Sequence, residues 1–353
     1  MEESKELQGF YKIFRAVIYI SVLMEFFEYA IDLAMLDHWG GILIDIHGRI
    51  KRWMIYNDGN LVYSKVATVL LLARRLSSCQ SKIDRIRIVP SLNPFRWGRP
   101  AQRKIWREGT RPILLPVVLS CAVIFPAHTS SAMLVFLTSL VMMLIGRVRV
   151  SELVRLVGLA CAALLLAGLL NLGRSETAGG RVSTWIDLWT SSQTEKPIDR
   201  LTDTERSMIA IHNGGLLGEG AGQSAMRVEM IHPESDYAYA FFVEEYGIIL
   251  AGILLMLYLW IFFRAREIFV RCGTAFPGLL VLGLALMITC QALLHVMVTV
   301  NLMPETGQTL PLISRGGSSV LFTVIALGMI LSVSRQNDEQ SHDTPRSESI
   351  YEK

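Results

Sequence analysis

Long apolar stretches separated by polar or charged connectors dominate the pattern of hydrophobic and polar positions along the chain. Most of these stretches approach the roughly 20 residues that a helix needs to cross ~30 Å of hydrocarbon. They are continuous rather than alternating, which favours helices over the alternating segments of a closed barrel. The pattern therefore predicts an all-α, polytopic membrane protein with about eight transmembrane helices. The expected spans are residues 13–37, 60–76, 112–126, 129–146, 153–172, 238–263, 275–300 and 317–334.

The first expected span differs from the others because it carries Glu25, Glu28 and Asp32. Their spacing of i, i+3 and i+7 places them on one helix face. A carboxylate at the centre of an isolated membrane helix costs a few kcal/mol. We therefore expect that face to look into the protein or into water, and a helix lying partly outside the bilayer is an equal alternative.

Composition supports the membrane class. The 353 residues are 52% hydrophobic and 18% charged, whereas soluble proteins are about 25% charged. The five cysteines show no spacing of a disulfide framework or a metal site. The acidic start of the chain is unlike a cleaved signal peptide, so the first apolar run is expected to stay as a signal anchor.

Basic connectors predict the orientation. Segment 74–111 holds eleven Lys or Arg against two acidic residues, and connectors 146–155 and 264–271 are also basic. Short basic loops stay on the cytoplasmic side. Both termini are therefore expected on the cytoplasmic side of the cytoplasmic (inner) membrane. A nucleic-acid partner is not expected, because the basic run lies between two spans. The polar residues 336–353 are expected to form a disordered cytoplasmic tail, leaving residues 1–335 as one transmembrane domain.

The external connectors are then 126–131, 301–316 and the long segment 173–236. A loop of some 60 residues exceeds ordinary connector length, which indicates function. Asp236 stands where this loop runs into an apolar helix. A carboxylate at the junction of a polar loop and a membrane helix is costly to desolvate and is often functional. The alternative is structural, with Ser235 or Asp236 capping the next helix.

The long loop also contains a glycine-rich run, 214–222. Glycines let the backbone approach a ligand closely or turn tightly. The run is not expected to be a P-loop, because no strand precedes it and no Lys-Ser or Lys-Thr follows. His128 and His295 are isolated in apolar stretches, and both are expected to be core histidines whose ring nitrogens are satisfied.

Together, three external motifs resemble the SEDS family, the membrane proteins of shape, elongation, division and sporulation. The first is the run Ile209–Ser224, the second is Pro233–Gly247, and the third is Leu302–Ser319, which reads LMPETGQTLPLISRGGSS. The resemblance covers roughly residues 50–334. Its finer features are most similar to FtsW, the division branch, in the form found in Bacteroidetes-like bacteria.

The resemblance implies a peptidoglycan glycosyltransferase that polymerises lipid II on the outer face of the membrane during cell division. The family's essential carboxylate maps onto Asp236, which could serve as the general base. A divalent cation, Mg or Mn, would be held by Asp236 and Glu234. Implied partners are lipid II, membrane lipids, a class B penicillin-binding transpeptidase and the divisome. Candidate substrate-binding residues are Arg52, Lys65, Arg181, Gly214, Gly215, Ser235, Pro304, Gly307, Pro311, Ser314, Arg315, Gly316, Gly317 and Ser318.

The chain departs from the family pattern in several places. The family usually has ten spans, about two more than are expected here. A Glu that usually precedes the second expected span is absent near Ser64 and Lys65. Arg315 stands where the family usually has an uncharged residue, and His295 where it usually has Asn. Two alternatives therefore stay open: a catalytically impaired relative that scaffolds a transpeptidase, and a lipid II flippase.

Overall fold

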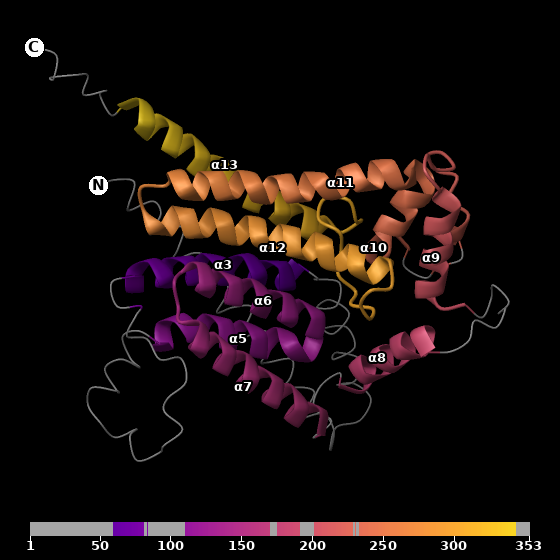
Figure 1. Cartoon of the computed structure of the whole chain (residues 1–353), viewed down its shortest axis with the longest axis horizontal. Coiled ribbons are helices and arrows are strands. Elements are labelled where there is room, and N and C mark those ends of the chain that lie inside the picture. The colour runs from indigo at the N-terminus through magenta and orange to yellow at the C-terminus, as the bar shows by residue number, and fades with distance from the viewer. Residues whose placement is uncertain are drawn as a thin grey trace, which may run out of the picture.

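The computed structural model describes residues 59–80, 83, 110–169, 175–190, 201–228, 230 and 233–343. Over these residues the chain is helical and contains no strand, so the predicted all-α class is confirmed. Each expected span from 60–76 onward coincides with one long helix (Figure 1). The first expected span, Arg52 and most of the basic connector lie outside the described residues. The long helices are α3 (Gly59–Cys79), α5 (Arg111–Ala127), α6 (Thr129–Ile145), α7 (Val150–Leu169), α11 (Ala238–Arg271), α12 (Ala275–Thr299) and α13 (Gly317–Asp343).

Three helices of the described part are long and apolar enough to cross a membrane: α11, α12 and residues 319–339 of α13. Their surroundings differ. Of the apolar stretch of α11 only 17% is buried, and large side chains such as Met256 and Trp260 are exposed. Of the apolar stretch of α12, 83% is buried. Outward-facing apolar side chains are stable where the solvent is lipid rather than water. The chain is therefore a multi-pass membrane protein in which α12 is the central helix.

Close packing places α12 against its neighbours α3, α6, α11 and α13. Gly283 of α12 illustrates the fit: a Cβ there would lie 2.6 Å from Met142 Cε of α6 and 2.8 Å from Val69 Cγ1 of α3. In lipid, small residues matter because van der Waals packing, and not release from water, holds helices together. A buried hydrogen bond of 2.6 Å between Thr68 Oγ1 and Ser120 Oγ also links α3 to α5.

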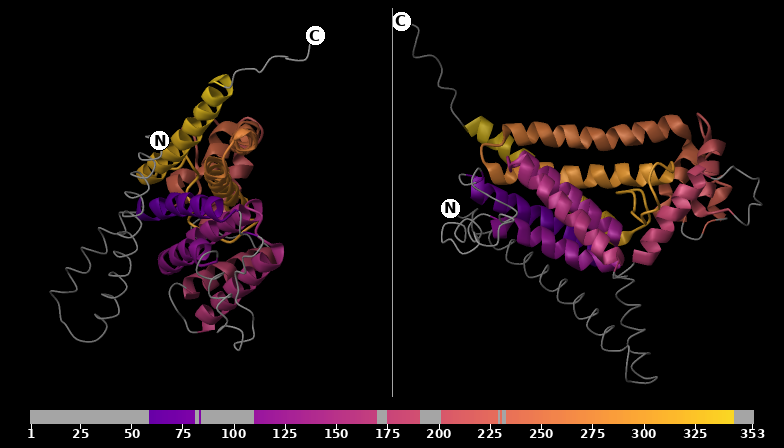
Figure 2. Two further views of the ribbon diagram at one scale, coloured as in Figure 1. Left: turned by 90° about the vertical axis from the view of Figure 1, so that its left-hand side faces the viewer. Right: turned by 60° about the horizontal axis from the view of Figure 1, so that its bottom comes forward.

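The segment predicted as one long loop is largely helical. It contains α8 (Ser175–Thr190), α9 (Asp203–Gly214), the 3₁₀ turn η5 (Met226–Val228) and the short α10 (Pro233–Asp236). These elements gather at one end of the bundle, beside the loop that joins α12 to α13 (Figure 2). The same end of the molecule therefore holds the three motifs that carry the resemblance.

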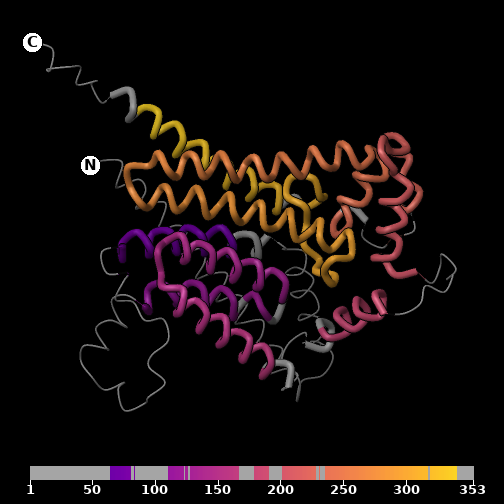
Figure 3. Tube along the Cα trace, viewed as in Figure 1, coloured from indigo at the N-terminus to yellow at the C-terminus, as the bar shows by residue number. Residues whose placement is uncertain are grey.

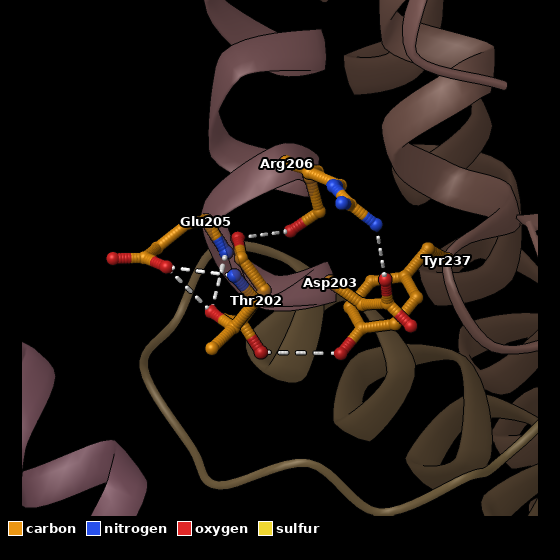
Figure 4. A network of polar contacts seen from close by, with 7 residues as sticks. Thr202, Asp203, Glu205, Arg206 and Tyr237 are labelled. Carbon is orange, nitrogen blue, oxygen red and sulfur yellow. Dashed lines mark hydrogen bonds and ion pairs between the residues drawn. The ribbon is translucent and has the colours of Figure 1, made fainter. Parts of the chain in front are cut away.

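Local sequence explains where α9 begins. Thr202 Oγ1 accepts a hydrogen bond from the Glu205 amide, and the Glu205 carboxylate accepts one from the Thr202 amide at 2.8 Å (Figure 4). This reciprocal capping box satisfies two of the amides that a helix start leaves open. The predicted hinge at 126–131 is shorter than expected, because His128 alone separates α5 from α6.

The predicted disordered tail is wrong for residues 336–343. Helix α13 continues through Asp343, and its yellow tube leaves the bundle at the end opposite α9 (Figure 3). Arg335 Nε and Glu339 Oε1 form an i,i+4 ion pair at 2.7 Å, and Asn337 Nδ2 lies 3.1 Å from Cys272 Sγ. Such pairs add a few tenths of a kcal/mol to a polar helix, and sequence polarity alone did not indicate them. Residues 344–353 lie outside the described part.

Candidate active site

Helix α11 is interrupted near its N-terminal end. Gly247 has φ 79° and ψ 167°, a backbone conformation that other residues rarely adopt. Such a break leaves helical amides and carbonyls without their usual partners. The glycine-rich run supplies replacements: the amides of Glu219 and Gly220 donate to the carbonyls of Glu244 and Glu245 at 2.9 and 3.0 Å. In return, the Ile248 amide donates to the Gly215 carbonyl at 3.0 Å.

Glycines are required where these two backbones meet. A Cβ at Gly214 would lie 2.1 Å from the Val243 carbonyl oxygen, and one at Gly218 would lie 2.3 Å from that of Glu245. The sequence predicted a close approach to a ligand or a tight turn, whereas the close approach in the structure is to the backbone of α11. The substrate-binding roles assigned to Gly214 and Gly215 stay predictions, and the structure gives Gly214 a packing reason that needs no ligand.

A buried carboxylate secures the same junction. Glu244 is fully buried; its Oε1 accepts from Asn213 Nδ2 at 3.2 Å and its Oε2 accepts from the Ser224 hydroxyl. Buried charged groups persist when hydrogen bonds satisfy them. Glu244 thus ties α9 and the end of the glycine run to α11, and a weak ion pair of 3.9 Å between Arg227 and Glu245 lies beside it.

Asp236 ends α10, immediately before α11. Its carboxylate is half-buried, and Oδ1 accepts a hydrogen bond of 2.8 Å from the Ser235 hydroxyl. The N-cap position of α11 is Tyr237, which has no side-chain cap. The capping alternative raised from the sequence is therefore wrong for α11. The second carboxylate oxygen, Oδ2, faces the loop that follows α12.

That loop, residues 301–316, covers Asp236. Gly307 has φ 62°, and a Cβ there would lie 3.8 Å from Asp236 Oδ2. Farther along, Ser314 Oγ donates to the Ser235 carbonyl at 2.8 Å and accepts from the Leu310 amide at 2.8 Å. The structure thus brings four predicted site residues together: Ser235, Asp236, Gly307 and Ser314.

Gln308 connects the covering loop to the membrane helices. Its side chain accepts from Lys65 Nζ of α3 at 2.9 Å and donates to Ser131 Oγ of α6 at 2.7 Å and Ser130 Oγ at 3.1 Å. Lys65 and Gln308 are 4% and 5% exposed. A buried ammonium group is stable only with such partners. Lys65 is therefore hydrogen-bonded to the residue that follows Gly307, the glycine that faces Asp236.

His295 of α12 contacts the same covering loop and is 1% exposed. Its Nδ1 is 2.6 Å from the Gln308 carbonyl, and its Nε2 is 3.3 Å from the Tyr239 amide, which donates. Both contacts require a neutral ring with its proton on Nδ1. The prediction of a satisfied core histidine is confirmed.

Tyr237, next to Asp236, is 2% exposed and faces the start of α9 (Figure 4). Its hydroxyl is 3.1 Å from Thr204 Oγ1. Burial and the nearby Glu305 carboxylate raise the pKa of this phenol well above its ordinary value of about 10. Tyr237 therefore joins three segments: α9, the start of α11 and the covering loop.

The other predicted site residues are more dispersed. Arg181 is exposed on α8, with Nη1 3.5 Å from the Glu305 carbonyl, and Arg315 is exposed on the covering loop. The carbonyl of Pro311 accepts from the Tyr258 hydroxyl, which is a structural contact. Pro304 and Gly316 lie in the covering loop. Gly317 and Ser318 begin α13.

The predicted metal site is not assembled by described side chains. Among the residues that the structure describes, no group of three or more His, Cys, Asp or Glu could hold an ion. The side chain of Glu234 lies outside that part. Within it, Asp236 has a serine and a glycine as neighbours, which do not form the set of oxygen ligands that Mg²⁺ requires.

The sequence did not indicate Gln308, Ser130, Ser131 or Tyr237 as part of the site. Gln308 lies inside a recognised motif, but its neighbours gave no reason to separate it from Thr306 or Thr309. Ser130 and Ser131 were seen as a hinge. The available signal was the presence of polar residues at the ends of apolar helices, which marks a lumen or a site as often as a turn.

The motifs that surround Asp236 have known counterparts in other proteins. A family model for cell cycle proteins of the FtsW/RodA/SpoVE type matches residues 63–339. The chain belongs to this family. The match spans the described bundle from α3 to α13 and confirms the SEDS resemblance. The finer likeness to the Bacteroidetes form stays a prediction.

Individual relatives of the FtsW/RodA/SpoVE family agree. The chain is 27% identical over 307 residues to the probable peptidoglycan glycosyltransferase FtsW of Thioalkalivibrio sulfidiphilus, covering 85% of this chain and 69% of the relative. It is also 27% identical over 298 residues to the protein of the same name from Coxiella burnetii, covering 82% and 72%. A solved structure, described as structural coordination of polymerization and crosslinking by a peptidoglycan synthase complex, shares the fold. Its TM-score is 0.56 at 19% identity, covering 94% of this chain and 83% of that one.

Proposed function

We propose that this protein is a peptidoglycan glycosyltransferase that polymerises lipid II into glycan strands during cell division, with Asp236 as general base. The observation that carries the proposal is the setting of Asp236. Its half-buried carboxylate is held by Ser235 on one side and faces Gly307 on the other. The relatives named as probable peptidoglycan glycosyltransferases support the reaction class.

In the proposed reaction, the 4-hydroxyl oxygen of an acceptor sugar attacks the anomeric carbon of a donor sugar. A carbon–oxygen bond forms, and the bond between the anomeric carbon and the pyrophosphate oxygen breaks. Undecaprenyl pyrophosphate leaves, and the hydroxyl proton passes to an oxygen of Asp236. A general base must lie within hydrogen-bond reach of that proton. Oδ2 is the suitable atom, because Ser235 already occupies Oδ1.

The leaving pyrophosphate gains negative charge as its bond breaks, so a nearby cation would lower the barrier. We assign this role to Lys65, because Gln308 fixes its ammonium group next to the loop that covers Asp236. Arg181 and Arg315 are exposed on the same external end and could bind the headgroup as it arrives. A divalent cation stays a proposal from the resemblance, and no step here passes through one.

The proposed setting is the cytoplasmic membrane, with both termini inside and Asp236 on the outer face. We also infer a single transmembrane domain. A neighbour in fold comes from a complex that coordinates polymerization and crosslinking, which supports a transpeptidase as partner. The exposed apolar side of α11 offers surface within the membrane for such a partner or for lipid.

The test is glycan synthesis by purified full-length protein, alone and with its transpeptidase partner, from labelled lipid II. We expect polymer from wild type and none from Asp236→Ala or Asp236→Asn. Asp187→Ala is the matched control, because Asp187 is an exposed carboxylate on α8, and it should polymerise normally. Equal product from wild type and Asp236→Ala would refute the role of Asp236. Wild type without polymer would favour the scaffold, and lipid II crossing liposomes without polymer would favour the flippase.

A further inference from the structure

We propose that His295 is a positioning residue that sets the distance between Asp236 and the covering loop; this rests on the proposed function of Asp236. Two chain segments, termed walls, meet at Asp236. One is the start of α11, which follows Asp236 directly, and the other is the covering loop at Gly307. His295 is not a candidate for proton transfer, because both its ring nitrogens are occupied.

The His295 ring is hydrogen-bonded to both walls at once. Nε2 accepts from the amide of Tyr239, three residues after Asp236, at 3.3 Å. Nδ1 donates to the carbonyl of Gln308, one residue after Gly307, at 2.6 Å. The imidazole is rigid, so the separation between its two nitrogens fixes how far the Tyr239 amide can lie from the Gln308 carbonyl. Tyr239 lies three residues after Asp236, and Gln308 lies one residue after Gly307. The ring therefore also limits the distance between Asp236 and Gly307.

The ring itself is held firmly. It is 1% exposed and belongs to the buried central helix α12. One turn later, Thr299 Oγ1 donates to the His295 carbonyl at 2.7 Å, and the Thr299 carbonyl accepts from Ser207 Oγ of α9 at 3.0 Å. A catalytic group must be supported by residues that are themselves locked. His295 meets this condition because α12, the helix that carries it, is buried in the helix bundle and is hydrogen-bonded to α9.

Two substitutions separate the two walls. In His295→Asn, the shorter amide reaches the place of Nδ1 and can still donate to Gln308, but it loses Tyr239. In His295→Gln, the longer amide reaches the place of Nε2 and can still accept from Tyr239, but it loses Gln308. His295→Ala loses both. Thr289→Val is the matched control, because Thr289 is another buried polar residue of α12 whose bond, to the Tyr258 carbonyl at 3.2 Å, lies outside the site.

The first measurement is the rate of polymerisation by full-length protein against the concentration of labelled lipid II. We expect His295→Ala to lower kcat roughly ten- to hundredfold with little change in KM, because small misplacement of a catalytic group costs on this order. His295→Asn and His295→Gln should each fall between wild type and His295→Ala, and Thr289→Val should match wild type. Equal kcat for His295→Ala and Thr289→Val, or wild-type kcat in either amide variant, overturns the proposal.

The second measurement does not depend on activity. Hydrogen–deuterium exchange should increase in both segments 236–241 and 305–310 in His295→Ala, and in neither segment in Thr289→Val. If wild type made no polymer, the proposed function would fail, and this exchange pattern would still decide whether His295 joins the two walls. Unchanged exchange in both segments of His295→Ala overturns the proposal.

Discussion

Gly218 and Gly247 lie backbone against backbone: a Cβ on either residue would come within 2.6 Å of the amide nitrogen of the other. The two residues are far apart in the sequence, yet each makes room for the other. Between them, the glycine run completes the hydrogen bonding of a helix that its own chain leaves open at Gly247. This junction lies next to the segment that carries Asp236, so its integrity bears on both stability and activity.

Replacing Gly247 by Ala should destabilise the protein strongly. The conformation at φ 79° costs a residue with a Cβ roughly 1–3 kcal/mol, and the added atom would lie 2.4 Å from the Leu216 carbonyl oxygen. Thermal unfolding of the purified protein measures the effect. Gly252→Ala is the control, because a Cβ at Gly252 of the same helix meets nothing within 4 Å. If the two variants unfolded at the same temperature, the junction would not have the importance assigned to it.

Replacing Glu244 should separate hydrogen bonding from charge. In Glu244→Leu, Asn213 and Ser224 lose a buried acceptor, which should cost about 1–3 kcal/mol. In Glu244→Gln, the amide oxygen can accept from Asn213 and the amide nitrogen can donate to Ser224, so most of the stability should remain. Unfolding midpoints of the two variants provide the comparison, and a Gln variant as unstable as the Leu variant would contradict this account.

Removing the charge of Lys65 should slow the chemical step. Lys65→Met keeps a similar volume but loses both the ammonium group and its bond to Gln308. We expect at least about a tenfold lower kcat, since stabilising developing charge is worth several kcal/mol. Arg264→Met is the control: Arg264 pairs with Glu267 at an exposed site, where an ion pair contributes about 0–1 kcal/mol. Equal rates in both variants would remove Lys65 from the proposed mechanism.

Tyr237 should make stability depend on alkaline pH. Its pKa is raised in the folded protein by burial and by Glu305, whereas in the unfolded chain it is about 10. Above pH 10 the unfolded chain therefore binds fewer protons than the folded one, and stability falls as pH rises. Below pH 10 the phenol is protonated in both states and contributes no slope.

The comparison is between wild type and Tyr237→Phe, with unfolding midpoints measured from pH 8 to pH 11. The difference between the two proteins should be constant up to about pH 10 and shrink above it, because only wild type must bury an ionisable hydroxyl. Tyr246→Phe, at a more exposed position of α11, should follow wild type. Parallel curves for wild type and Tyr237→Phe would show that the phenol is not held as the structure indicates.

The long helices were predictable because length and apolarity decide whether a segment can lie in a membrane. The boundaries of α6 and α12 follow from His128, Gly146 and the segment rich in Gly and Pro that begins at Asn301. The extent of α13 was missed for a physical reason. Its last residues are polar and would not form a helix by propensity alone, and contacts such as that between Asn337 and Cys272 depend on the assembled fold.

The site was only partly predictable. Asp236 followed from its local setting, a carboxylate at the start of an apolar helix, whereas Ser235, Gly307 and Ser314 were predicted only through the resemblance of the motifs to the family. The roles of Gln308 and Tyr237 depend on partners distant in the sequence, Lys65 and Thr204 among them. No local pattern specifies which distant side chain will meet a given amide or phenol, so these contacts required the three-dimensional structure.

The burial of α12 also bears on how the protein is made. Its hydropathy of 2.2 suits entry into a bilayer as a single helix, and at that stage Gln291 and His295 would face lipid tails. Their partners, Thr309 and Gln308, follow in the chain and reach them only when the covering loop folds back. The same polar side chains that are tolerated during insertion thus draw the helix out of lipid once its partners exist. We therefore expect the folding of the covering loop to satisfy the polar side chains of α12 and to complete the surroundings of Asp236 in the same step.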